Sequence, residues 1–226
     1  MKSDREIIAE LEEITGRKLQ VVGKDISLVN YNKPGVHYED DRVIKLSLYN
    51  YGLKSLPEIV TELRSLRRLY VVQNNLTALP EAIGNLEFLR HLWLTYNKLE
   101  KLPYSIGDLR SLEYLNLGRN NLKTLPISIG NLKSLKILLI SSNNIETLPV
   151  SFLNLESLRS INIANNPILE GEYFGNLAAH YDIDFPKIFQ FLRRKRQDEI
   201  EKFKKKFEEN EKKYKKVADG FIVDFR

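Results

Sequence analysis

Apolar residues recur along the middle of the chain with a period of 23 residues. Each repeat follows the pattern L-x-x-L-x-L-x-x-N-x-L-x-x-L-P, and the central repeats continue with x-x-I-G-x-L. The alternating L-x-L segment predicts a short strand with one buried face, and successive repeats should lay these strands parallel in one sheet. The opening residues are Val43, Leu66, Leu89, Leu112, Leu135 and Leu158, so six repeats are predicted over residues 43–168.

An asparagine stands eight residues after the opening residue in all repeats but the first. Its side-chain amide can donate to and accept from turn backbones of neighbouring repeats, which a sharp bend otherwise leaves unpaired. The outer half of the repeat then returns behind the strand, where proline disfavours a second strand and Gly84, Gly107 and Gly130 are expected to permit a tight reversal. Because the outer half is the bulkier one, stacking should curve the array. The asparagines are Asn74, Asn97, Asn120, Asn143 and Asn166.

These motifs resemble the leucine-rich repeat family, and in particular its 23-residue LPxxIGxL subtype, which occurs in Ras-suppressor, Scribble/Erbin-like and plant Ras-group intracellular proteins. The resemblance extends from Val43 to His180. It implies an α/β fold, a horseshoe-shaped solenoid with a parallel sheet on its concave side. By analogy alone, it also implies an interaction module or scaffold, with a small GTPase as one candidate partner.

Residues 1–42 are expected to cap the first repeat with a short helix and a hairpin. The sequence Ser3-Asp4-Arg5-Glu6 is typical of a capping box that begins a helix, and Gly16 should end that helix. Segments 18–22 and 26–31 alternate like two strands, with a turn predicted at 32–35. The first repeat departs from the pattern by placing Tyr51 where the asparagine belongs, as terminal repeats often do.

The chain after the last repeat divides into two segments. Residues 169–192 are expected to cap the C-terminal end of the core, and residues 193–226 to form a charged amphipathic helix with a short strand-like tail. Apolar residues in that helix follow heptad spacing over a short run. Three alternatives stay open: the helix projects into solvent, packs on the repeats or a partner, or self-associates. We expect a monomer.

Composition excludes several function classes. Apolar residues make up 42% of the chain, enough for a core, yet no apolar run approaches the roughly 18 residues of a membrane-spanning helix. The charged N-terminal sequence and the lack of cysteine favour the cytoplasm. With three scattered histidines, no cysteine nucleophile and no phosphate-loop or hydrolase motif, we expect no enzyme activity, no cofactor and no metal site.

Positive charge is concentrated near the C-terminus. Of the net charge of +5, residues 187–216 contribute +7, from 13 Lys and Arg against 6 Asp and Glu, which leaves −2 elsewhere. An alternative function, binding of nucleic acid or an anionic membrane surface, would therefore belong to the basic C-terminal helix. We do not expect a small-molecule substrate.

The register of the repeat predicts which side chains face the concave surface, namely those two, four, six and seven residues after each opening residue. Exposed aromatic residues interleaved with arginine are typical of protein-binding hot spots, although cross-strand packing alone also favours aromatics. We expect His91 to act as an interface donor, and Arg119 is the candidate if the chain acts on a GTPase. The predicted protein-binding residues are Tyr49, Arg68, Tyr70, His91, Trp93, Tyr96, Tyr114, Arg119, Ile137 and Leu139.

Overall fold

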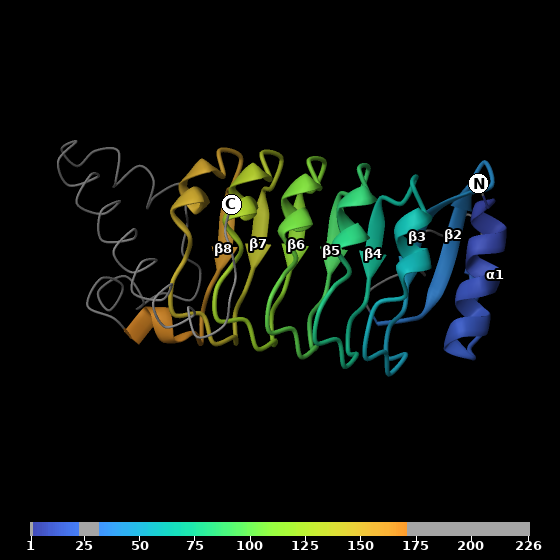
Figure 1. Ribbon diagram of the computed structural model, residues 1–226, viewed down its shortest axis with the longest axis horizontal. Coiled ribbons are helices and arrows are strands. Elements are labelled where there is room, and N and C mark those ends of the chain that lie inside the picture. The colour runs from blue at the N-terminus through green and yellow to red at the C-terminus, as the bar shows by residue number, and fades with distance from the viewer. Residues whose placement is uncertain (1, 23–31, 171–226) are drawn as a thin grey trace.

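The computed structural model describes residues 2–22 and 32–170. Eight strands form one sheet in chain order, β1 to β8, and short 3-10 helices lie behind the strands of the repeats (Figure 1). All neighbouring strands are parallel except β2 and β3, which pair antiparallel. The strands are β1 (Val21–Val22), β2 (Gly35–Glu39), β3 (Arg42–Ser47), β4 (Arg68–Tyr70), β5 (His91–Trp93), β6 (Tyr114–Asn116), β7 (Ile137–Leu139) and β8 (Ser160–Asn162).

The core lies between the strands and the outer helices. The central residue of each strand from β4 to β8, leucine in four and Ile161 in β8, points into it, so that Leu92, Leu115 and Leu138 are aligned in register and fully buried. The predicted parallel sheet of short strands is therefore confirmed for the repeats. The outer helices are η2 (Glu58–Glu62), η3 (Glu81–Asn85), η4 (Tyr104–Asp108), η5 (Ile127–Asn131) and η6 (Val150–Asn154), whereas η7 (Pro167–Glu170) follows β8 and lies outside this row.

The asparagine ladder has the predicted hydrogen bonds. The Asn97 amide nitrogen donates to the carbonyl oxygens of Val71 at 2.7 Å and Leu94 at 3.0 Å, and its Oδ1 accepts from the backbone N–H of Leu76 at 3.0 Å. The same three kinds of contact recur at each ladder asparagine of the later repeats. One side chain thus satisfies turn groups in two adjacent repeats.

The glycines of the outer half have a different role from the one expected. None of Gly84, Gly107 and Gly130 adopts a positive φ, so they are not needed for a left-handed turn. They lie in 3-10 helices against the next repeat, and a Cβ on Gly107 would stand 2.4 Å from the carbonyl oxygen of Ser128. The glycines are therefore required by the close approach of neighbouring repeats.

The N-terminal helix α1 spans Asp4–Thr15 and begins at a capping box between Ser3 and Glu6. Gly16 ends it in the left-handed conformation, with φ of 64°. Its apolar face joins the core, and Asp4 Oδ2 accepts a hydrogen bond from the backbone N–H of Val43 at 2.7 Å. This contact fixes the helix to the start of the first repeat.

The turn predicted at residues 32–35 is confirmed at Asn32 only and is wrong at its end, because Gly35 begins β2. Gly35 lies opposite Ser47, and β1 pairs parallel with β2, so these strands do not form a hairpin. The hairpin is β2–β3, and its turn is formed by Asp40 and Asp41, with φ of 47° and 59°. Aspartate tolerates this conformation, and the Pro-Gly sequence instead enters the strand. The predicted strand at 26–31 lies outside the described residues.

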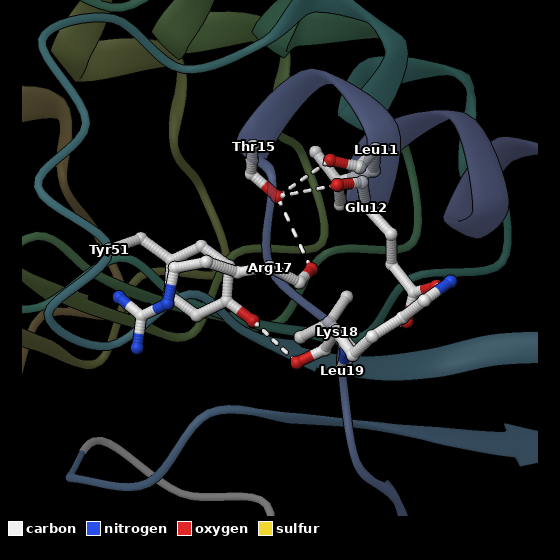
Figure 2. A network of polar contacts seen from close by, with 7 residues as sticks. All are labelled: Leu11, Glu12, Thr15, Arg17, Lys18, Leu19 and Tyr51. Atoms are coloured by element: carbon white, nitrogen blue, oxygen red, sulfur yellow. Dashed lines mark hydrogen bonds and ion pairs between the residues drawn. The ribbon is translucent and has the colours of Figure 1, made fainter.

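Tyr51 replaces the ladder asparagine of the first repeat by contacting the N-terminal segment (Figure 2). Its hydroxyl donates to the Lys18 carbonyl oxygen at 3.2 Å, and the guanidinium of Arg17 lies 4.1 Å from its ring centroid. Arg17 also donates to the carbonyl oxygen of Asn50 at 2.6 Å. An asparagine here would have no preceding repeat to bridge, whereas tyrosine reaches the segment after α1.

Two predicted segments fall largely outside the described residues. The C-terminal cap is described only at residues 169 and 170, which end η7, and the charged helix and tail at 193–226 are not described. Among the helices of residues 2–22 and 32–170, none has the length and apolar character to cross a bilayer.

Candidate functional site

The strand register places two rows of side chains side by side on the face of the sheet opposite the core. The first row lies two residues after each opening residue, and the second row lies four residues after it. Each member is aligned with the next across adjacent strands. The first row is Lys45, Arg68, His91, Tyr114, Ile137 and Ser160, and the second row is Ser47, Tyr70, Trp93, Asn116, Leu139 and Asn162.

Four rings from β4, β5 and β6 make a continuous aromatic cluster, defined here as Tyr70, His91, Trp93 and Tyr114. The Trp93 and Tyr114 rings stack at a centroid distance of 4.7 Å and an interplanar angle of 18°. His91 stacks on Tyr114 at 5.9 Å, and Tyr70 meets Trp93 at 5.9 Å with the rings tilted by 46°. Sequence register predicted these residues to share one face, and the structure brings them into contact.

The cluster is less exposed than the sequence suggested. Tyr70 is buried, at 7% exposure, while His91, Trp93 and Tyr114 are half-buried. The expectation that the aromatic residues face open solvent is therefore wrong for Tyr70. The reason is cross-strand packing, because directly opposed aromatic side chains cover one another. The remaining three rings keep part of their surface available to a partner.

Burial also shifts the protonation of the cluster. Loss of hydration raises the pKa of Tyr70 and of Tyr114, so both hydroxyls stay protonated. Burial lowers the pKa of His91, and the neighbouring Arg68 guanidinium lowers it further. At neutral pH, the cluster therefore presents neutral rings and hydrogen-bonding groups rather than a cationic imidazole.

Three predicted residues lie at one rim of the sheet. Tyr96 is 51% exposed, and the guanidinium of Arg119 lies 4.9 Å from its ring centroid. The Tyr49 hydroxyl donates to Gln73 Oε1 at 2.8 Å. Tyr96 and Arg119 both adopt positive φ, at 58° and 55°, although neither is glycine. The Tyr96–Arg119 pair forms an exposed cation–π contact beside the cluster.

Ile137 and Leu139 extend the face on β7, where both are half-buried. They lie opposite Tyr114 and Asn116 in the strand register. Along the array, the face thus changes from the buried Lys45 and the half-buried Arg68, through aromatic residues, to aliphatic residues at β7.

The sequence prediction omitted a charged row that flanks the first row, one residue after the opening residue of the second to sixth repeats. Glu113 in this row lies 2.6 Å from Lys136 Nζ and 3.8 Å from Arg90 Nη1. Arg67 pairs with Glu39 at 3.3 Å. The charge of each residue in this row can be read from the sequence with the 23-residue period. Which of these residues form ion pairs depends on how far each side chain extends across the neighbouring strands. The flanking row is Arg67, Arg90, Glu113, Lys136 and Arg159.

The arrangement is suited to recognition. It offers ring faces, hydroxyl and guanidinium donors and an aliphatic patch on a rigid sheet, which are the groups that bind protein side chains. Within the described part of the chain, no group of three or more His, Asp or Glu residues could hold a metal ion.

Comparison with known proteins agrees with this architecture. A family model described as "Leucine rich repeat" matches residues 64–122, and one described as "Leucine-rich repeat region" matches residues 105–180. Among curated proteins, no match is found.

Three solved structures are similar to this chain. A leucine-rich repeat protein of Leptospira interrogans is 31% identical, with a TM-score of 0.41, over 66% of this chain and 41% of that one. The ectodomain of the receptor kinase GASSHO1/SCHENGEN3 from Arabidopsis thaliana, in complex with CASPARIAN STRIP INTEGRITY FACTOR 2, is 31% identical, with a TM-score of 0.49, over 54% and 15%. This chain thus spans less than half the length of either.

The third structure shares the fold over most of its length. The ectodomain of the receptor kinase SOBIR1 from Arabidopsis thaliana is 23% identical, with a TM-score of 0.58, and the match covers 74% of this chain and 94% of that one. The repeat motif, the parallel sheet with its asparagine ladder and the two family matches together show that the chain belongs to the leucine-rich repeat family.

Proposed function

We propose that this chain is a non-catalytic protein-interaction module that holds a protein partner against the concave face of its sheet. The observation that carries the proposal is the aromatic cluster, in which three half-buried rings from β5 and β6 remain in contact with one another and partly open to solvent. Large, partly exposed aromatic residues at the centre of a surface are typical of binding hot spots.

The rigidity of the cluster supports a binding role. Trp93 belongs to a strand paired on both sides, and its carbonyl oxygen accepts from the backbone N–H of Val71 at 2.8 Å. Its ring is stacked on Tyr114 before any partner arrives. A partner would therefore bind side chains that are already ordered, which reduces the entropic cost of association.

The finer features of the function are proposals of the same kind. We infer that the partner belongs to small-GTPase signalling or a scaffold and that the protein acts in the cytoplasm, as the resemblance to the LPxxIGxL subtype and the composition favour. We also propose that residues 1–42, with α1, β1 and β2, cap the first repeat, since Ile7, Ile8 and Leu11 of α1 cover the start of the core.

The test is a pull-down with the full chain, followed by calorimetry with the captured partner. Trp93→Ala should lose capture, whereas Asn162→Ala, on the second row of the sixth repeat, should keep it. If Trp93→Ala binds like wild type while charge reversal at Arg194 and Lys205 abolishes binding, the basic C-terminal segment is the binding site and the proposal is wrong.

A further inference from the structure

The hydroxyl groups of Tyr70 and Tyr114 lie near each other on the concave face. Tyr70 belongs to β4 and Tyr114 to β6, on either side of β5, and both rings contact Trp93 of β5. An ionised Tyr70 would raise the pKa of Tyr114, so the two hydroxyls are near enough to interact across β5. The face therefore presents a pair of phenol groups around its tryptophan.

Each hydroxyl oxygen already accepts a hydrogen bond from a neighbouring side chain. Arg68 donates to the Tyr70 hydroxyl, and Asn116 donates to the Tyr114 hydroxyl. The direction of the second bond is fixed, because Asn116 Oδ1 accepts from the backbone N–H of Gly118 at 3.1 Å, which leaves the amide nitrogen to face Tyr114. Each hydroxyl is thus left with its O–H to offer.

Both hydroxyls are donors that lack an acceptor in the described part of the chain. Burial raises the pKa of Tyr70 and of Tyr114, so both keep their protons at neutral pH. Among the hydrogen bonds of the described residues, none has either hydroxyl as its donor, whereas the Tyr49 hydroxyl donates to Gln73. Tyr70 is only 7% exposed, and a buried donor without an acceptor is unfavourable. An acceptor supplied by a partner would remove that cost.

The rings of the cluster present their edges, not their faces, to a partner. The Trp93 and Tyr114 rings stack at an interplanar angle of 18°, and the His91 and Tyr114 rings at 23°, so neighbouring rings cover one another's faces. The edge of an aromatic ring carries partial positive charge, whereas its face is negative. Ring edges and O–H groups together favour an oxygen acceptor over a flat ring that would stack.

The acceptor that fits this pair is uncharged. Among the described residues, the groups that shift the pKa of the Tyr114 hydroxyl are Asn116 and Tyr70, and neither is a cation. Arg68 acts on Tyr70 but not on Tyr114, and Lys45 is only 3% exposed. An anion would therefore lose its hydration and gain a charged neighbour on one side only. A carbonyl oxygen loses less hydration and has two lone pairs for two donors.

Resting on the proposed function, we propose that the Tyr70 and Tyr114 hydroxyls form a donor pair that binds one main-chain carbonyl oxygen in an apolar segment of the protein partner. The surroundings of the pair indicate the source of the carbonyl. Trp93 contacts both phenols, and Ile137 and Leu139 follow on β7, all three half-buried. Apolar side chains of the partner match these residues, and the main chain is then the source of acceptors in such a segment.

Trp93 provides a direct measurement, because it is the only tryptophan of the chain and contacts both rings. The experiment titrates the full chain with poly-L-proline, with excitation selective for tryptophan. Poly-L-proline offers main-chain carbonyl acceptors on an apolar chain that has no backbone N–H. Poly-L-glutamate is the comparison ligand, because its carboxylates test an anionic acceptor.

The variants remove a hydroxyl and keep the ring. Tyr70→Phe and Tyr114→Phe test the pair, and Tyr104→Phe is the matched control, since Tyr104 is 58% exposed on the outer helix η4. Urea melts verify that each variant is folded. The same variants are then compared in binding the captured partner.

We expect poly-L-proline to change Trp93 emission in a saturable manner that is nearly insensitive to salt, because no ion pair forms. Loss of one neutral hydrogen bond should weaken binding about fivefold in Tyr70→Phe and in Tyr114→Phe. Tyr104→Phe should bind like wild type.

Three outcomes would overturn the inference: no saturable response to poly-L-proline, wild-type binding by either hydroxyl variant, or a stronger response to poly-L-glutamate. The proposed function fails separately. If a captured partner needs Trp93 but binds both hydroxyl variants like wild type, the concave face binds a partner without this carbonyl contact. If the poly-L-proline response needs both hydroxyls but the captured partner does not need Trp93, the pair binds a carbonyl and the proposed function is wrong.

Discussion

Trp93 and Tyr114 stack face to face across β5 and β6, at 4.7 Å and 18°. The contact joins consecutive repeats on the surface of the sheet, in addition to the backbone hydrogen bonds beneath it. It therefore has two consequences that can be measured separately, one for stability and one for binding.

For stability, Trp93→Ala and Tyr114→Ala should be coupled. Stacked aromatic pairs contribute about 0.5–1.5 kcal/mol beyond the area that they bury. A double-mutant cycle from urea melts should give a coupling energy in that range. A matched cycle between Trp93 and Tyr49, which are not in ring contact, should give a coupling near zero.

For binding, Trp93→Ala should weaken association with the captured partner by about 2 kcal/mol, roughly thirtyfold, because a central aromatic residue is desolvated on contact. Calorimetry measures the loss. Ser160→Ala and Asn162→Ala lie on the same face in the sixth repeat and should lose far less. Equal losses at all three positions would remove the cluster as the centre of the interface.

In the core, Leu115→Ala should lower the free energy of unfolding by about 2–5 kcal/mol. Leu115 is fully buried between Leu92 and Leu138 in the sheet register, so truncation leaves a cavity. Denaturant melts measure the change, with the exposed Lys123→Ala as control. A loss below roughly 0.5 kcal/mol would contradict the assigned inward orientation.

In the ladder, Asn97→Ala should cost about 1–3 kcal/mol, because it leaves the Leu76 N–H and the Val71 carbonyl without their partner. Hydrogen exchange should quicken at the amide of Leu76. The neighbouring exposed Asn121→Ala should change neither quantity. Unaltered protection at Leu76 in the Asn97 variant would show that the ladder contributes little.

The free energy of unfolding should decrease as the pH is lowered, because His91 takes up a proton more readily in the unfolded chain. Its pKa in the folded chain lies below the ordinary 6.5, so the unfolded chain binds the proton more readily. The contribution of His91 is complete above about 6.5 and is lost as the pH falls toward the folded-state pKa. Melting curves should show this slope flattened in His91→Gln, and NMR titration of the imidazole should give the lowered pKa. The groups around the ring are Arg68, Lys45, Arg90, Glu113 and Tyr114.

The repeat could be predicted from sequence because its positions are fixed by a constant period. Strand registers, buried leucines and ladder asparagines all follow from counting 23 residues, and the same count placed Trp93 and Tyr114 on one face. Whether these residues bind a partner stays a prediction.

The remaining features depend on contacts between particular residues that the 23-residue period does not predict. Burial of Tyr70 comes from the neighbouring Trp93 ring, and the role of Gly107 comes from the approach of Ser128 in the next repeat. The N-terminal turn was misplaced because Pro34-Gly35 is a strong local turn signal, whereas pairing of β2 with β3 moves the turn to the two aspartates. Segments from residue 171 onward remain predictions.

The residues at positive φ on the rim of the sheet affect how this surface can change during evolution. Every repeat places a non-glycine residue at positive φ seven residues after its opening residue, at a cost of about 1 kcal/mol each. Glycine would remove that cost, but it would also remove the side chain. Because the adjoining strand pairs and the ladder asparagine, or Tyr51 in the first repeat, anchor each repeat on either side of this position, the rim residue can be replaced without rebuilding the repeat. If the concave face binds a partner as proposed, six sites can thus acquire new partner preferences while the scaffold is inherited unchanged: Asn50, Gln73, Tyr96, Arg119, Ser142 and Asn165.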